Sequence, residues 1–86
     1  EFALLMPATR IEDAQICLER CRNTIAALEI PYSYKNEQVN IRITCSFGLA
    51  CQSSVTSSRD QLLIEADDAL YQAKQTGRNK IVTGPV

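Results

Sequence analysis

Apolar residues recur in two different periods along this chain, and each period predicts a different kind of element. A continuous apolar run at residues 2–6 stops at Pro7, which predicts a short buried strand. The next segment carries a capping box, with Thr9 as the N-cap and Glu12 three residues later. Helical spacing then predicts a helix that ends before Pro31, with an apolar stripe made of Ala14, Cys17, Leu18, Cys21, Ile25 and Leu28.

A strict alternation of apolar with polar or small residues marks the middle of the chain. This period of two predicts a strand over residues 39–49 with one buried face. Residues 32–34 precede this strand across a polar turn at 35–38, so we expect them to pair with it as a hairpin. The face expected to be buried consists of Val39, Ile41, Ile43, Cys45, Phe47 and Leu49.

A second helix is predicted after the serine-rich loop at residues 53–58. Ser58 and Gln61 form another capping box at its start. Gly77 fits the C′ position at its end, because glycine adopts the left-handed conformation most easily. Residues 80–82 are expected to form a last short strand. The core face of this helix is predicted to be Leu62, Leu63, Ala66, Ala69, Leu70 and Ala73.

The predicted order of elements is β-α-β-β-α-β, which is an α+β fold. We expect a mostly antiparallel sheet with the helices packed on it, as in ferredoxin-like domains. This layout hosts many unrelated functions, so the fold alone does not decide the activity. An RNA-binding module would need aromatic residues along a central strand to stack bases, and the strand here offers only Phe47, on the buried face.

Composition limits the remaining classes of function. The chain has 86 residues, of which 45% are hydrophobic and 22% charged, as in one small globular domain. A net charge of −1 gives no general attraction to nucleic acid polymers or to anionic membranes. No apolar run approaches the ~20 residues of a membrane span, so we expect a cytoplasmic segment without membrane contact, with anchoring of a longer protein left open.

The cysteines are expected to be buried thiols. Cys17 and Cys21 lie four apart on one helix face, a spacing that could suit a metal. The chain has no histidine and no CxxC motif, which disfavours zinc. No secretion signal is visible, so reduced thiols at core-facing positions are favoured over disulfides for Cys17, Cys21 and Cys45.

Three stretches resemble the GGDEF domain of diguanylate cyclases. They read EFALLMP at residues 1–7, ITCSFGLA at 43–50 and ADDALYQAKQTGRNKI at 66–81, and the last is the most specific. The T-x-S-x-G pattern inside the second stretch adds independent support. Glu1 and Phe2 match the last two letters of the family signature, and the chain does not begin with methionine. The resemblance therefore implies that residues 1–86 are the C-terminal portion of a single GGDEF domain, related to palm-type nucleotide cyclases, with its N-terminal portion absent.

The resemblance implies a nucleotidyl transfer. Each such domain holds one GTP, and two domains pair as a symmetric homodimer to form cyclic di-GMP and two pyrophosphates. Two Mg²⁺ ions neutralise phosphate charge, so acidic residues hold metal and basic residues hold phosphate. Two alternatives stay open. One is a degenerate, non-catalytic GGDEF domain that acts as a nucleotide receptor or dimerisation module, and the other is a stand-alone ferredoxin-like ligand-binding module.

The resemblance also assigns site residues. Glu1 matches a catalytic, metal-binding acid, and a carboxylate suits a hard cation such as Mg²⁺, although the residue alone favours an ordinary surface charge. Lys74 and Arg78 match the pair that binds the terminal phosphates of GTP. Their spacing alone favours simple helix termination, because cations in a last turn complement the helix dipole.

Three further residues have more than one interpretation. Arg20 matches an arginine that completes a product-inhibition site for cyclic di-GMP, and ordinary surface charge is an equally open interpretation. Asp67 and Asp68 are adjacent, so they do not share a helix face and do not form an acid–base pair. We expect Asp67 to be structural, Asp68 to be solvated, and Tyr71 to pack its ring while exposing its hydroxyl.

Overall fold

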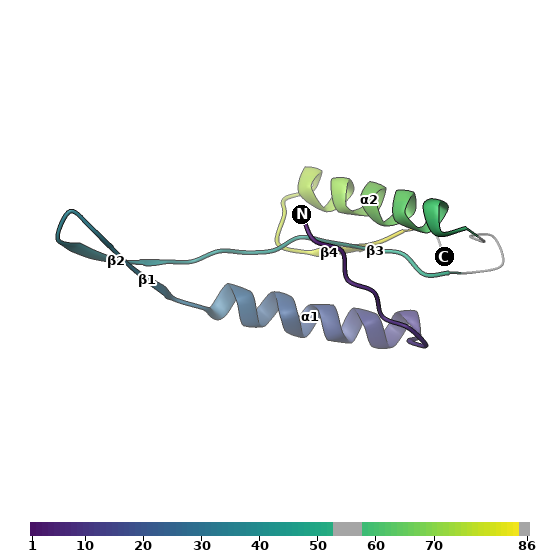
Figure 1. Cartoon of the computed structure of the whole chain (residues 1–86), viewed down its shortest axis with the longest axis horizontal. Helices are drawn as coiled ribbons and strands as arrows, with labels where there is room; N and C mark the ends of the chain where they lie inside the picture. The colour runs from purple at the N-terminus through teal and green to yellow at the C-terminus, as the bar shows by residue number, and fades with distance from the viewer. Residues whose placement is uncertain (53–57, 85–86) are drawn as a thin grey trace.

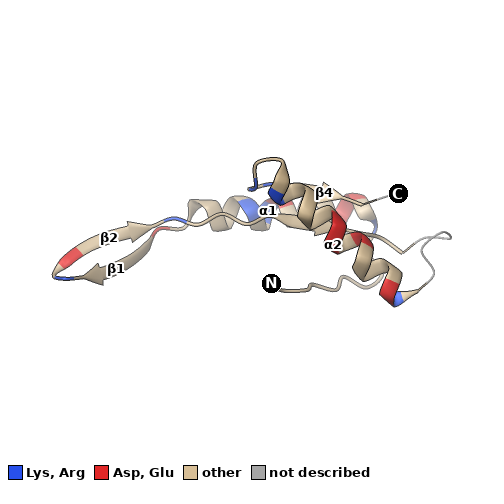
Figure 2. Ribbon diagram, turned by 90° about the horizontal axis from the view of Figure 1, so that it is seen from above, with Lys and Arg blue, Asp and Glu red and all other residues tan. Residues whose placement is uncertain are grey.

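The computed structural model describes residues 1–52 and 58–84. Within these ranges it has two helices and two small two-stranded sheets, so the chain is α+β (Figure 1). The molecule measures 56 × 23 × 20 Å, because one hairpin projects far from the remainder (Figure 1 and Figure 2). The elements in order are α1 (Ile11–Ala27), β1 (Ile30–Tyr34), β2 (Glu37–Ile41), β3 (Phe47–Leu49), α2 (Arg59–Gln75) and β4 (Ile81–Thr83).

The body of the molecule is built around the β3–β4 pair. These strands run parallel, with Gly48 opposite Val82. The pair lies between α2 and α1, and both helices contact it (Figure 1). Leu49 forms a core with Ala14 and Leu18 of α1. Met6, Ile11, Phe47 and Ile81 pack around that cluster.

The second helix begins and ends as its sequence signals predict. Ser58 is the N-cap, and its Oγ accepts a hydrogen bond from the backbone N–H of Gln61 at 3.0 Å. At the other end Gly77 has a φ of 118°, and the N–H of Arg78 donates to the carbonyl of Ala73 at 2.9 Å. This six-to-one bond is the Schellman arrangement, so the prediction of Gly77 at C′ is confirmed. The expected loop before Ser58 lies outside the described residues.

The first helix begins one residue later than predicted. Arg10 is its N-cap and makes no side-chain capping bond. The hydroxyl of Thr9 instead donates to the carbonyl of Pro7 at 3.0 Å, so the predicted Thr9–Glu12 capping box is wrong. Glu12 and Asp13 lie in the first turn, where their charge complements the positive end of the helix dipole.

The strand predicted at residues 2–6 is absent from the part of the chain that the structure describes. A strand needs a hydrogen-bonded neighbour, and neither sheet includes this segment. Phe2 and Leu5 are largely exposed, and only Met6 reaches the core. The apolar run therefore follows the body of the molecule without joining a sheet.

The long strand predicted at residues 39–49 is also wrong, because it is interrupted. Its first part is β2, which pairs antiparallel with β1 across a turn at Lys35 and Asn36. Both turn residues have positive φ, of 49° and 66°, as two-residue hairpin turns require. The hairpin itself is therefore confirmed. The last part of the predicted strand, β3, belongs to a separate parallel pair with β4. The expected single, mostly antiparallel sheet is therefore not formed.

The expected burial of the alternating face holds only at its far end. Leu49 is buried, whereas Val39, Ile41 and Ile43 are 40–46% exposed. In the hairpin Val39 lies opposite Tyr32 and Ile41 opposite Ile30, so these side chains share one face. No described element covers that face, because the hairpin extends away from both helices (Figure 1).

Two other burial predictions need correction. Cys17 is exposed, since the buried stripe of α1 is centred on Ala14 and Leu18. The other cysteines, Cys21, Cys45 and Cys51, are half-buried free thiols. Leu63 of α2 is 55% exposed, while Glu65 is buried beside Ala69 and Ala73. Neither described helix is long and apolar enough to cross a membrane.

Candidate functional site

Glu1 and Lys74 lie together although they are 73 positions apart in the sequence. The ammonium of Lys74 donates to the Glu1 carboxylate across 3.2 Å. Lys74 stands in the last turn of α2, and the N-terminus passes close to that end of the helix (Figure 1). The Lys74 side chain is 34% exposed and that of Glu1 is 65% exposed. The pair is therefore accessible to a ligand from solution.

A small pocket surrounds this pair. Its α2 residues lie three or four positions apart, except for the adjacent Leu70 and Tyr71, which places them on one side of the helix. Two carboxylates and one ammonium give it a polar side, and a leucine and a tyrosine ring give it an apolar one. Its volume is about 180 Å³, and its lining is Glu1, Asp67, Leu70, Tyr71 and Lys74.

The size of the pocket limits what it can hold. Pockets that enclose a whole small molecule usually measure ~300–1,000 Å³. At about 180 Å³, this one fits a phosphate group or a hydrated ion and not a complete nucleotide. Asp67 lines it, so its position is compatible with contact to a ligand as well as with the structural role expected from the sequence. Tyr71 also lines it, but this residue is 63% exposed, so the expectation that its ring packs against the protein is wrong.

The structure does not bring Arg78 into this pocket. Arg78 is exposed and follows Gly77, where the chain leaves the helix axis. It has a φ of 62°, and Asn79 has one of 52°. Three consecutive residues with positive φ turn the chain sharply after α2. The predicted convergence of Lys74 and Arg78 on one ligand stays a prediction.

Arg20 is exposed on α1 and does not line the pocket. A second, wider groove of about 500 Å³ lies between α1 and β4. It contains two carboxylates and no basic residue, which makes it unsuitable for phosphate. The lining of this groove is Glu12, Gln15, Ile16, Glu19, Ile81 and Thr83.

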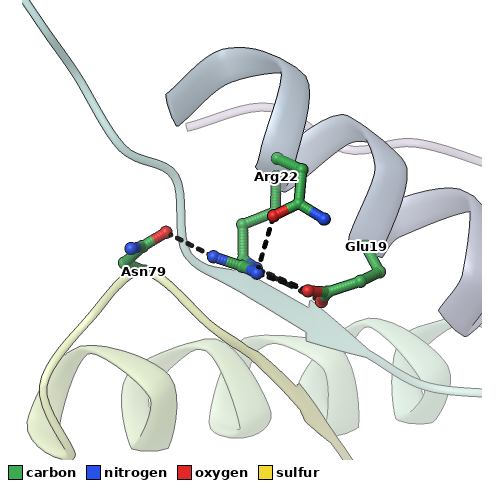
Figure 3. A network of polar contacts seen from close by, with 4 residues as sticks. Glu19, Arg22 and Asn79 are labelled. Carbon is green, nitrogen blue, oxygen red and sulfur yellow. Dashed lines mark hydrogen bonds and ion pairs between the residues drawn. The ribbon is translucent and has the colours of Figure 1, made fainter. Parts of the chain in front are cut away.

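Arg22 lies at the centre of a network of polar contacts, and its bond to the distant Asn79 was not predicted from the sequence (Figure 3). Its guanidinium is bonded to the Glu19 carboxylate, and it donates to the side-chain oxygens of Asn23 and Asn79, each at 3.0 Å. The hydrogen bond with Arg22 holds the pKa of Glu19 below its usual range and raises the pKa of Arg22. The three-residue spacing of Glu19 and Arg22 signals their pairing. The distant Asn79 leaves no such local signal.

A metal ion would need ligands beyond the described residues. Among these residues no three acids or cysteines gather closely enough to hold one. Glu1 and Asp67 both line the small pocket. Mg²⁺ is commonly bound by one or two protein carboxylates together with substrate phosphates and water. The pocket therefore fits Mg²⁺ as a partial ligand set and not as a complete cage.

Comparison with known proteins assigns the family. The family model for the diguanylate cyclase GGDEF domain matches residues 1–80. Diguanylate cyclase DgcP of Pseudomonas aeruginosa is 38% identical over 81 residues, which are 94% of this chain and 11% of that protein. Response regulator PleD of Caulobacter vibrioides is 33% identical over 82 residues, 95% of this chain and 18% of that protein.

A third relative gives the same result. Diguanylate cyclase A of Treponema denticola is 31% identical over 81 residues, covering 94% of this chain and 21% of that protein. The chain thus spans less than a quarter of the length of these three relatives. Because the family match extends over nearly all of it, the chain belongs to the GGDEF domain family of diguanylate cyclases.

Proposed function

We propose that this chain supplies the phosphate-binding part of a domain that condenses two GTP molecules into cyclic di-GMP and two pyrophosphates. The observation that carries the proposal is the contact of 3.2 Å between Lys74 and Glu1 in a pocket of phosphate size. Family membership supports GTP as the substrate, and the names of the relatives support the reaction. We include in the proposal the pairing of two such domains as a homodimer.

The pair suits phosphate chemistry for an electrostatic reason. A phosphate oxygen that enters the pocket would take the place of the Glu1 carboxylate as acceptor for the Lys74 ammonium. Hydrogen bonds between charged partners are typically worth ~1.5–3 kcal/mol, so Lys74 is able to contribute substantially to nucleotide affinity. The displaced carboxylate of Glu1 would then be free to bind a cation that accompanies the phosphates.

Each residue has a distinct role in this proposal. Lys74 holds negative charge on the terminal phosphates, and Arg78 holds the same phosphates from the segment that follows α2. Glu1 acts as a carboxylate ligand for magnesium, which would neutralise phosphate charge when bound. The pocket of about 180 Å³ is too small for guanine and ribose, so residues outside it would hold these groups.

The test is product formation by the full-length protein that carries this sequence. Cyclic di-GMP formed from GTP and Mg²⁺ is measured by chromatography. We expect Lys74→Ala and Arg78→Ala to raise the KM for GTP about ten- to a hundredfold. Arg59→Gln is the matched control, because the Arg59 side chain is 89% exposed at the opposite end of α2.

Two outcomes would count against the proposal. An unchanged KM for GTP in both variants would show that Lys74 and Arg78 do not bind its phosphates. Binding of GTP without any product would instead support the degenerate family member, in which the domain receives a nucleotide and signals without catalysis.

Arg20, which is exposed on α1, is proposed to bind the product cyclic di-GMP and so to inhibit the enzyme. Arg20→Ala would then relieve inhibition by added cyclic di-GMP.

A further inference from the structure

Arg22 of α1 reaches the segment that follows α2, where Arg78 lies. Its Nη1 donates to the side-chain oxygen of Asn79 at 3.0 Å, across 57 positions of sequence (Figure 3). The backbone N–H of Asn79 donates in turn to the hydroxyl of Ser46 at 3.1 Å. Asn79 is therefore held on two sides, by α1 and by the residue just before β3.

The held segment has a left-handed backbone conformation. Arg78 and Asn79 have φ values of 62° and 52°, in the left-handed region that residues with a Cβ seldom occupy. Such conformations persist where the surrounding structure fixes them. Within the described residues the fixing bonds are those of Asn79 to Arg22 and Ser46, and that of the Arg78 N–H to Ala73 at 2.9 Å.

Arg22 is itself fixed in place. Its side chain is only 19% exposed, and Glu19 and Asn23 bind the same guanidinium that reaches Asn79 (Figure 3). The planar fork of arginine allows these bonds to be made at once in different directions. A lysine at this position has a single ammonium and would not reproduce the arrangement. The direction of the fork is therefore determined before any ligand binds.

We propose that Arg22 is a positioning residue for Arg78, acting through Asn79. The inference rests on the proposed function, in which Arg78 binds the terminal phosphates of GTP. Arg22 does not touch the nucleotide. It fixes the backbone of the residue next to Arg78, and this restricts the directions in which the Arg78 guanidinium extends. An ordered cation loses less conformational entropy when it binds phosphate, so the arrangement raises affinity for the nucleotide.

The experiment measures GTP affinity of the full-length protein by titration calorimetry, with thermal unfolding recorded for every variant. Arg22→Gln is expected to weaken GTP binding about tenfold, since small misplacements of binding groups have effects of that order or larger. Arg22→Lys is expected to rescue little of the loss. Arg42→Gln is the matched control, because Arg42 forms an exposed ion pair with Glu29 at 2.8 Å, just outside the strands of the hairpin.

The double variant Arg22→Gln/Arg78→Ala separates positioning from plain stabilisation. If Arg22 acts through Arg78, the double variant binds GTP no more weakly than the single variant Arg78→Ala. An equal loss from Arg22→Gln with and without Arg78 would overturn the inference, as would a folded Arg22→Gln protein with unchanged affinity. If Arg78→Ala itself binds GTP with unchanged affinity, Arg78 does not bind the phosphates, and the inference about Arg22 fails as well.

Asn79→Gly keeps the test decisive if Arg22→Gln does not fold. Glycine tolerates the positive φ, and the Arg22–Glu19 bond is untouched. The variant removes only the side-chain acceptor that Arg22 reaches. We expect it to weaken GTP binding as Arg22→Gln does, and only when Arg78 is present. Unchanged affinity in Asn79→Gly would overturn the inference.

Discussion

Gly48 passes so close to Ala66 that a Cβ on the glycine would lie 2.1 Å from the Ala66 carbonyl oxygen. The same Cβ would lie 2.3 Å from the backbone nitrogen of Leu70. Both distances are far inside van der Waals contact, and both neighbours are helix backbone that does not yield easily. The absence of a side chain at Gly48 thus allows β3 to pack directly against α2.

Gly48→Ala is therefore expected to destabilise the protein by at least ~1–3 kcal/mol, the usual range for overpacking. Gly84→Ala is the control, since its Cβ would lie 3.3 Å from the Glu65 carbonyl oxygen and a slight shift would accommodate it. Denaturant unfolding of the full-length protein measures both. Equal stability of the two variants would contradict the close packing of β3 on α2.

The hairpin and the core are expected to respond differently to substitution. Ile41 is 40% exposed on the uncovered hairpin face, whereas Leu49 is 7% exposed between the helices. We expect Ile41→Thr to change the free energy of unfolding by no more than ~0.5 kcal/mol, and Leu49→Ala to lower it by ~2–5 kcal/mol. The same unfolding experiment tests both, and a large loss in Ile41→Thr would show that the hairpin face is covered.

The Glu19–Arg22 pair predicts a dependence of stability on pH. The hydrogen bond with Arg22 lowers the pKa of Glu19 below its ordinary value of 4.5. A carboxyl with a lowered pKa stabilises the folded state above its unfolded pKa, and this contribution is lost as the pH falls through the folded pKa. Arg22 stays charged throughout. We therefore expect Glu19→Gln to lower the melting temperature at pH 7 and to have a smaller effect well below pH 4.5. An equal effect of Glu19→Gln at both pH values would contradict this dependence of stability on pH.

Glu1 is predicted to change its effect on GTP affinity with magnesium. Without Mg²⁺ the carboxylate competes with phosphate for Lys74, so Glu1→Gln should leave GTP binding unchanged or stronger. With Mg²⁺ the same variant loses a metal ligand, and GTP binding should weaken. Titrations with and without Mg²⁺ compare the two conditions. A loss of GTP affinity of the same size with and without Mg²⁺ would show that Glu1 is not a ligand of the metal.

The sequence predicted best those features that depend on neighbouring residues. The N-cap at Ser58 and the C′ glycine at Gly77 are local signals, and α2 lies between them. The turn at Lys35 and Asn36 is another local feature, close to where the polar residues indicated it.

Features that depend on tertiary partners could not be predicted in the same way. The alternation over residues 39–49 indicates an apolar face but not whether another element covers it. The bond from Arg22 to Asn79 joins residues 57 positions apart and has no periodic signal. Resemblance to a known family pointed to Glu1 and Lys74, and the structure adds that they lie 3.2 Å apart.

The role of Lys74 in binding the terminal phosphates is tested most directly by comparing the affinities of GTP and GMP for the full-length protein by titration calorimetry. Lys74→Ala removes the ammonium proposed to bind the terminal phosphates, which GMP lacks. Lys35→Ala is the control, because it removes the same charge from the exposed hairpin turn. We predict that Lys74→Ala weakens GTP binding about ten- to a hundredfold and leaves GMP binding unchanged, with neither affected in Lys35→Ala. GTP affinity in Lys74→Ala equal to that of the unaltered protein would show that Lys74 does not bind the terminal phosphates.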